Sequence, residues 1–225
     1  MHKIETMLVL QQQLNDATNG TNWERGSTKN NKIIDWRRCI YLEAAELIES
    51  YPWKHWKNID AQPDYENIRI EAVDIWHFVM SEALRIYNIE AKGTINTLAK
   101  AITEEKGYEA FLSSATLSYQ NHYQEIAIVE DFIRSLFCNE SIEVLVSKFF
   151  AVAALAGLNL DTLYALYIGK NILNRFRQDH GYKEGSYIKI WKNREDNVVM
   201  QEILEENREI TPETLYQKLE EVYPA

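Results

Sequence analysis

Paired carboxylates on two neighbouring helical segments constrain this chain more than any other feature of its sequence. Glu43 and Glu46 stand three residues apart in DWRRCIYLEAAELIES, and Glu71 and Asp74 stand three apart in DYENIRIEAVDIWHFVMS. Residues i and i+3 share one face of an α-helix, so each pair projects two carboxylates in one direction. Because the connection between the segments is short and contains prolines, we expect an antiparallel pair of helices on which the four carboxylates converge.

Four converged carboxylates need neutralisation, because their repulsion reaches several kcal/mol even at a moderate effective dielectric. Protons or hard cations supply it, and an all-oxygen ligand set suits Mg²⁺, Mn²⁺ or Ca²⁺ rather than zinc. The alternative interpretation is a solvated acidic helix face, which is common for a single pair of this kind. The apolar neighbours on both segments argue against it, and so does the small number of nearby cations, which are Arg37, Arg38 and Arg69.

The composition fits one all-α domain over residues 1–225, a multi-helix bundle whose core is the antiparallel pair that carries the acids. Only 8 glycines and 4 prolines interrupt the 225 residues, which favours long helices. The net charge of −10 argues against general nucleic-acid binding, which needs a basic surface. The two cysteines fit a reduced, cytoplasmic protein, and we expect neither a signal peptide nor a membrane span.

Hydrophobic periodicity and cap residues predict the remaining helices. We expect them at residues 3–17, 119–137, 141–156 and 162–180, with two short helices in the tail after residue 195. The predicted N-caps and stops are Asp35, Asp64, Asp161, Gly157 and Thr211 with Pro212 after it. Residues 89–118 carry only weak helical pieces, and we interpret the stretch of about 89–140 as a variable insertion.

Two further sets of polar residues sit at helical spacing. Lys170, Asn174 and Arg177 lie at i, i+4 and i+7, which makes one stripe of a helix. In so acidic a chain this stripe predicts a local anion site, although cations that merely complement the helix dipole are an equal alternative. Gln12 and Asn15 lie at i and i+3, where two amides can meet a planar polar ligand, but taken alone they fit an ordinary polar helix face better.

Several blocks of the chain resemble the dimeric, all-α dUTPases, which are relatives of the MazG-type nucleotide pyrophosphohydrolases. The paired ExxE and ExxD acids are shared with that wider superfamily and indicate only a metal-dependent pyrophosphohydrolase. The blocks QxxLND and GKNxLNxFRxxxGYK are typical of the dUTPase branch. The matching stretches are LQQQLND, WRRCIYLEAAELI, WKHWKN, ENIRIEAVDIWHF, YIGKNILNRFRQDHGYKEGSY and EDN.

The resemblance implies hydrolysis of dUTP, and also of dUDP, to dUMP by a homodimer that uses Mg²⁺, with Mn²⁺ as a substitute. It implies that Glu43, Glu46, Glu71 and Asp74 hold the metal, and that Glu43 or Glu46 is the general base. The substrate-binding residues it implies are Gln12, Asn15, Trp53, His77, Phe78, Lys170, Asn174, Arg177, Tyr182, Lys183 and Asn197. A dUTPase of this kind keeps uracil out of DNA and supplies dUMP.

Three alternatives come from other classes. One is a related all-α nucleoside triphosphate pyrophosphohydrolase with a different base specificity. Another is a di-iron carboxylate bundle, suggested by Asp74-x-x-His77, but the partner motif at Glu43 lacks the histidine that this class carries on a second helix. The last is a non-enzymatic helical interaction protein with acidic faces.

Overall fold

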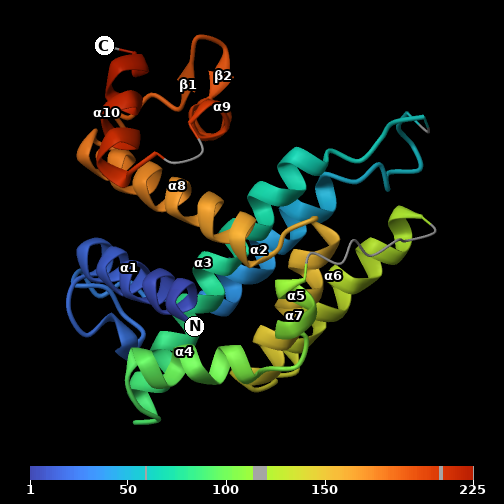
Figure 1. Cartoon of the computed structure of the whole chain (residues 1–225), viewed down its shortest axis with the longest axis vertical. Helices are drawn as coiled ribbons and strands as arrows, with labels where there is room; N and C mark the ends of the chain where they lie inside the picture. The colour runs from blue at the N-terminus through green and yellow to red at the C-terminus, as the bar shows by residue number, and fades with distance from the viewer. Residues whose placement is uncertain (59, 114–120, 208–209, 225) are drawn as a thin grey trace. The chain divides into compact units, whose positions relative to one another are not determined.

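The computed structural model of the chain describes residues 1–58, 60–113, 121–207 and 210–224. The chain divides into two compact units, residues 1–163 and residues 164–225. Helices dominate both units, which confirms the all-α prediction (Figure 1). The interpretation of residues 1–225 as a single domain stays a prediction.

The first unit is built from helices alone among its described residues. They are α1 (His2–Asn19), the 3₁₀ helix η1 (Trp23–Arg25), α2 (Trp36–Glu49), α3 (Tyr65–Ile89), α4 (Ile95–Glu104), α5 (Tyr108–Leu112), α6 (His122–Phe137) and α7 (Ile142–Leu155). Helix α8 (Leu160–Asp179) begins in this unit and continues into the second. No single described helix is long and apolar enough to cross a membrane. Helices α7 and α8 reach that length and apolar content only together, and they are bent by 94° where they meet.

Helices α2 and α3 pack antiparallel, as the sequence predicts. At one end the Ser50 carbonyl accepts the Asp64 N–H at 2.9 Å, and at the other the rings of Trp36 and Phe78 stack with centroids 5.9 Å apart. The end of α2 therefore lies beside the start of α3, and its start lies beside the far half of α3. Asp35 and Asp64 cap the two helices through their side chains, which confirms both predicted N-caps.

Helix α3 is the core of the first unit. Most of its side chains are buried, and they face in all directions around the helix. A helix that is apolar on every side needs neighbours on every side, and α1, α2, α4 and α7 pack against it. Trp76 is fully buried and stacks on Phe149 of α7 with ring centroids 4.7 Å apart. The apolar side chains of α7 are thereby covered within the chain itself.

The second unit combines the rest of α8 with α9 (Asp196–Glu206), α10 (Pro212–Val222) and a small hairpin of β1 (Ile190–Trp191) and β2 (Arg194–Glu195). Its core surrounds the fully buried ring of Phe176, which meets Trp191, Tyr216 and Tyr223. Gly169 lets α9 approach α8, because a Cβ there would lie 2.6 Å from atoms of Met200 and Leu204. The sequence analysis missed the hairpin, whose strands are only two residues long.

One predicted cap is wrong. Asn159, not Asp161, caps α8, because its side-chain oxygen accepts the N–H groups of Asp161 and Thr162, both at 2.9 Å. Asparagine caps as well as aspartate does, and it comes first in the chain. Asp161 then falls in the first turn, where it pairs with Lys3 at 2.6 Å. The predicted helix at 119–137 starts at His122, and residues 119–120 lie outside the described part of the chain.

A buried ion-pair network ties α3 to α2 and α6. The carboxylate of Glu82, whose residue is only 2% exposed, accepts Arg37 at 3.1 Å and Arg85 at 2.7 and 2.9 Å. Arg37 also donates to the Glu140 carbonyl at 2.9 Å, just beyond the end of α6. The hydrogen bonds that Arg85 donates to Glu82 raise the pKa of Arg85, against the opposing effect of burial.

We expect Glu82→Gln to lower the free energy of unfolding by about 3 kcal/mol, because it leaves two guanidinium groups without their shared anion. Chemical denaturation measures this loss. Glu90→Gln is the matched control, since Glu90 ends the same helix in an exposed pair with Lys92 and should cost at most ~1 kcal/mol. Equal effects of the two substitutions would contradict a structural role for Glu82.

Candidate active site

The acidic faces of α2 and α3 meet as the spacing predicts, for three of the four carboxylates. Oxygen atoms of Glu43, Glu46 and Glu71 lie within 4.8 Å of one another, close enough to share one ion. Glu71 is buried, Glu43 is half-buried and Glu46 is exposed, so the cluster opens to solvent along α2. Asp74 is half-buried one turn further along α3 and is not part of this close group.

The arginines nearest in sequence to the cluster are engaged elsewhere. Arg37 binds Glu82, Arg38 pairs with Asp35 at 3.2 Å, and Arg69 donates to the Ala156 carbonyl at 3.3 Å. The negative charge of this region also affects Cys39. Burial raises the pKa of its thiol, and the charges of Glu43 and Asp35 raise it further. A cluster of this charge attracts cations.

A buried polar network joins α1 to the helix that carries Glu71. Ser81 Oγ accepts the side-chain amides of Gln11 and Asn15, both at 3.0 Å, and donates to the His77 carbonyl at 2.8 Å. The Gln11 amide also donates to Asn15 Oδ1 at 3.2 Å, and Gln11 Oε1 lies 2.8 Å from His77 Nδ1. All four residues are at most 4% exposed. Asn15 and His77, both predicted substrate-binding residues, therefore belong to one network.

Gln12 lies apart from this network. Its side-chain amide donates to Glu24 at 3.0 Å and to Asp16 at 3.1 Å. The structure thus pairs Asn15 with Gln11, four residues earlier, and not with Gln12, three residues earlier. Both spacings place residues on one helix face, so the sequence pattern alone does not choose between them. Gln11 and Ser81 are the residues that the sequence analysis missed here.

The predicted aromatic residues occupy two places. Phe78 is half-buried and stacks on Trp36, which in turn meets Trp23 edge to face at 5.6 Å. Trp53 follows α2, meets Trp56 at 5.6 Å and lies under the Lys54 ammonium at 5.4 Å. The predicted aromatic residues therefore belong to two separate clusters, one between α2 and α3 and one in the connection after α2.

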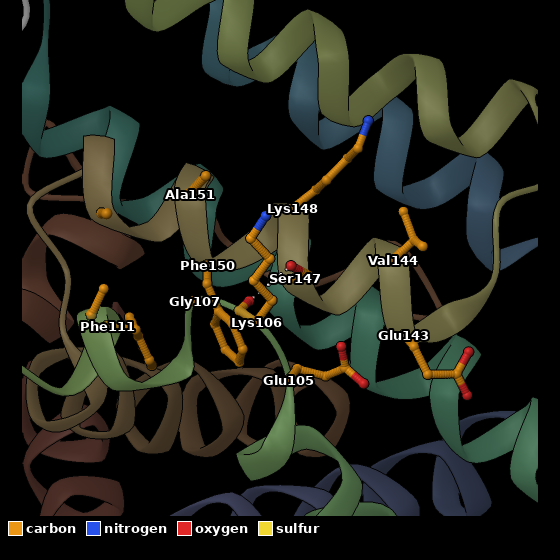
Figure 2. A pocket seen from close by; sticks show the side chains of 12 residues that line it. Glu105, Lys106, Gly107, Phe111, Glu143, Val144, Ser147, Lys148, Phe150 and Ala151 are labelled. Atoms are coloured by element: carbon orange, nitrogen blue, oxygen red, sulfur yellow. Dashed lines mark hydrogen bonds between the residues drawn. The ribbon is translucent and has the colours of Figure 1, made fainter.

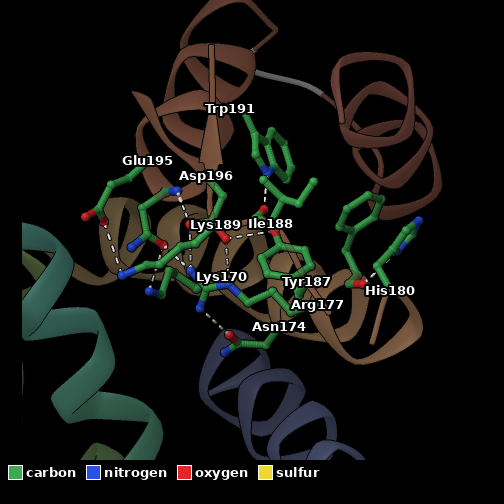
Figure 3. Close-up of polar contacts among 12 residues, drawn as sticks. Lys170, Asn174, Arg177, His180, Tyr187, Ile188, Lys189, Trp191, Glu195 and Asp196 are labelled. Carbon is green, nitrogen blue, oxygen red and sulfur yellow. Dashed lines mark hydrogen bonds and ion pairs between the residues drawn. The ribbon is translucent and has the colours of Figure 1, made fainter. Parts of the chain in front are cut away.

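In the second unit the cationic stripe is tied to the start of α9 (Figure 3). Arg177 donates from Nε and Nη2 to the two carboxylate oxygens of Asp196, both at 2.8 Å, and from Nη1 to Asn174 Oδ1 at 3.2 Å. Lys170, only 3% exposed, donates to Asn197 at 3.0 Å. The predicted residues Lys170, Asn174, Arg177 and Asn197 are thus brought together. Asp196, which holds them, was missed because a single aspartate in EDN shows no periodic signal.

Asp196 is fully buried, and its partners keep it ionised. Burial by itself would raise the pKa of this carboxyl, but the hydrogen bonds and charge of Arg177 outweigh it and lower the pKa below the ordinary value of 3.8. Tyr187 also donates to Asp196 at 2.8 Å. Burial and the nearby carboxylate raise the pKa of Tyr187, so its hydroxyl keeps its proton.

Tyr182 and Lys183 are both exposed on the turn that follows α8. Gly181 makes the turn with a φ of 84°, and a Cβ there would lie 2.1 Å from Ser186 Oγ. The ring of Tyr182 lies 5.9 Å from the Arg177 guanidinium carbon. The turn therefore places Tyr182 beside the stripe.

A comparison with known protein families identifies the family of the chain. A family model described as dUTPase matches residues 3–182. The chain belongs to the all-α dimeric dUTPase family. It is a dUTP diphosphatase. The match spans the α2–α3 carboxylates, the buried amide network and the stripe as far as Tyr182, whereas Lys183 and Asn197 lie beyond it. No curated protein matches the chain with significance.

This dUTPase also has an apolar cavity of about 580 Å³ between α5 and α7 (Figure 2). Phe111 and Phe150 stack in its wall at 5.1 Å, and Glu105, Lys106, Glu143 and Lys148 lie at its edge. Among the described residues that line it, none is a predicted site residue. One side of it belongs to the variable stretch of about 89–140, and the other to the helix predicted at 141–156.

We expect the Asp196–Arg177 pair to make the second unit sensitive to acid. Because the pKa of Asp196 is lowered on folding, its contribution to stability is complete above the ordinary pKa of 3.8 and is lost as the pH falls through the folded value. Asp196→Asn should be less stable than the parent protein at neutral pH, and this difference should shrink below about pH 4.

Thermal melts from pH 7 to pH 3 measure that difference. Asp179→Asn is the control, because Asp179 is an exposed acid at the end of α8, the helix of Arg177, with partners at the surface in Tyr216 at 2.9 Å and Arg175 at 3.8 Å. A difference between Asp196→Asn and the parent that stays constant with pH would contradict the pairing.

Proposed function

We propose that this dUTPase hydrolyses both dUTP and dUDP to dUMP, with Mg²⁺ held by Glu43, Glu46, Glu71 and Asp74. With dUTP and water the products are dUMP and pyrophosphate. One observation carries the proposal: two helices of a dUTPase-family chain bring three carboxylates within 4.8 Å of one another. Mn²⁺ substitutes for Mg²⁺ because both are hard cations that prefer oxygen.

The donor set fits such a metal. Every ligand is a carboxylate oxygen, and Mg²⁺ is commonly held by a few carboxylates together with substrate phosphates. The exposed side of the cluster, at Glu46, leaves room for both. When bound, the metal neutralises phosphate charge and lowers the pKa of a bound water. Asp74, one turn from Glu71, completes the set once a cation draws the carboxylates together.

The residues of the chain divide the remaining work. Glu43 or Glu46 accepts the proton of the attacking water as general base. Asn15, Gln12, Trp53, His77 and Phe78 bind the base and sugar. Cations and polar groups of the second unit bind the phosphates, and they are Lys170, Asn174, Arg177, Tyr182, Lys183 and Asn197. Their contribution is positioning and charge neutralisation, the main requirements of phosphoryl transfer.

The main alternative is a related pyrophosphohydrolase with a different base specificity. A panel of nucleoside triphosphates with Mg²⁺, scored for pyrophosphate release, separates the two. Preference for dUTP over dCTP and dTTP supports the proposal, and equal or greater release from another nucleotide contradicts it. Rejection of the thymine methyl contributes only ~1–3 kcal/mol, whereas cytosine leaves polar groups unpaired and is rejected more strongly.

We expect Glu46→Gln and Asp74→Asn each to abolish turnover while the fold is kept, because each removes a negative ligand without changing side-chain size. Pyrophosphate release should fall below a few per cent of the parent rate, and titration with Mn²⁺ should show weakened binding. Glu49→Gln is the matched control, since Glu49 is an exposed acid of the same helix that pairs with Lys54. Full activity in either site variant would count decisively against the cluster.

We also propose that the chain forms a homodimer in the cytoplasm. The family is dimeric, and α6 leaves two large rings exposed, Tyr123 at 58% and Phe137 at 66%. The apolar residues of α7 are mostly buried within the chain, so they do not call for a partner. Both cysteines are free thiols, which suits a reducing compartment.

Sedimentation at micromolar concentration should give twice the chain mass of 26.4 kDa. Phe137→Glu should shift the protein toward monomer, because it places a charge in the expected contact. A monomeric parent protein would overturn the dimer.

A further inference from the structure

We propose that Ser81 is a positioning residue for base selectivity, which acts by fixing the orientation of the Asn15 side-chain amide. This inference rests on the proposed function, in which Asn15 meets the base. Ser81 is fully buried on α3, and its hydroxyl lies at the centre of the network with Gln11, Asn15 and His77.

The single proton of Ser81 determines the polarity of the network. The hydroxyl donates to the His77 carbonyl at 2.8 Å, so its lone pairs can only accept from its other neighbours. Both amide groups therefore turn their NH₂ toward Ser81, at 3.0 Å each. The Gln11 NH₂ also donates to Asn15 Oδ1 at 3.2 Å. If the Asn15 amide were reversed, its NH₂ would face the NH₂ of Gln11, and its oxygen would face the accepting oxygen of Ser81.

The orientation of an amide decides which pyrimidine it matches. After its bonds to Ser81 and Gln11, Asn15 has one N–H and one oxygen lone pair left to offer. Uracil presents a carbonyl acceptor beside the N3–H donor, and cytosine presents an amino donor beside the N3 acceptor. If the same amide is turned by 180°, its donor and acceptor change places. An amide that matches uracil in one orientation therefore matches cytosine in the other. A fixed amide is therefore a condition for choosing between them.

The same logic fixes the tautomer of His77. Because the Gln11 NH₂ is turned toward Ser81 and Asn15, its Oε1 faces His77 Nδ1 at 2.8 Å and must accept from it. The proton of the neutral ring therefore sits on Nδ1. This prediction concerns the ligand-free protein and does not depend on activity.

The test compares Ser81→Ala with Ser135→Ala. Ser135 is an equally buried serine whose hydroxyl donates to a carbonyl of its own helix, Phe132 at 2.5 Å, but it holds no side-chain amide of the network. Ser81→Ala should reduce the ratio of kcat/KM for dUTP over dCTP by about tenfold or more, mainly through a higher KM for dUTP and a lower KM for dCTP. Ser135→Ala should keep the parent ratio. A folded Ser81→Ala protein with the parent ratio overturns the proposal.

A second measurement keeps the proposal testable if Ser81→Ala does not fold. Nitrogen NMR of the unaltered, ligand-free protein should show His77 as the Nδ1–H tautomer, with its signal assigned by its loss in His77→Gln. An Nε2–H tautomer overturns the proposed polarity. Absence of dUTP hydrolysis by the parent protein would defeat the proposed function instead, and the tautomer would still decide the orientation of the network.

Discussion

The antiparallel packing of α2 on α3 is the constraint on which the rest of the structure depends, because it forces like charges together. Glu43, Glu46 and Glu71 are held with oxygens within 4.8 Å, where each fully charged pair repels by the order of a few kcal/mol. Apolar burial along α3 and the Glu82 network hold the helices in place against that repulsion. In the proposed function a cation that enters the cluster relieves this repulsion, so one helix pair links the core of the fold to the proposed binding of metal.

Helix α3 serves the proposed site with two adjoining stretches. Glu71 and Asp74 carry the acids near its start, and His77 and Ser81 carry the buried polar network one and two turns later. The rigidity of a helix packed on all sides fixes the spacing between the two stretches. A buried polar network is stabilised as its members find partners, and Ser81 supplies one to each of the Gln11 and Asn15 amides and to the His77 carbonyl.

The sequence predicted the features that arise from local periodicity and capping. The i, i+3 acids, the caps Asp35, Asp64 and Thr211 and the turn at Gly157 follow from neighbours within four residues, and the structure has them. Apart from the meeting of the acids on α2 and α3, it did not predict side-chain contacts between distant segments. Gln11 at i−4 and Gln12 at i−3 are equally good partners for Asn15 by spacing, and only Ser81, 66 residues from Asn15, selects Gln11. The cap Asp161 failed for a different reason, because two residues of similar capping strength compete within one turn.

The bond between Arg177 and Asp196 changes how the cationic stripe should be understood. The two interpretations considered from sequence were a phosphate site and a set of cations that complement a helix end. The structure adds a third role, in which Arg177 holds the first turn of α9 through a buried carboxylate. Lys170, Arg177 and Asp196 together carry one net positive charge, so Asp196 weakens the attraction for phosphate. In return it fixes the guanidinium and aligns Asn197 beside it, which removes most of the entropy that two long side chains would lose on binding. If the stripe binds phosphates as proposed, this organisation favours a well-defined pose of the phosphates over raw affinity, and in phosphoryl transfer the pose is what accelerates the reaction.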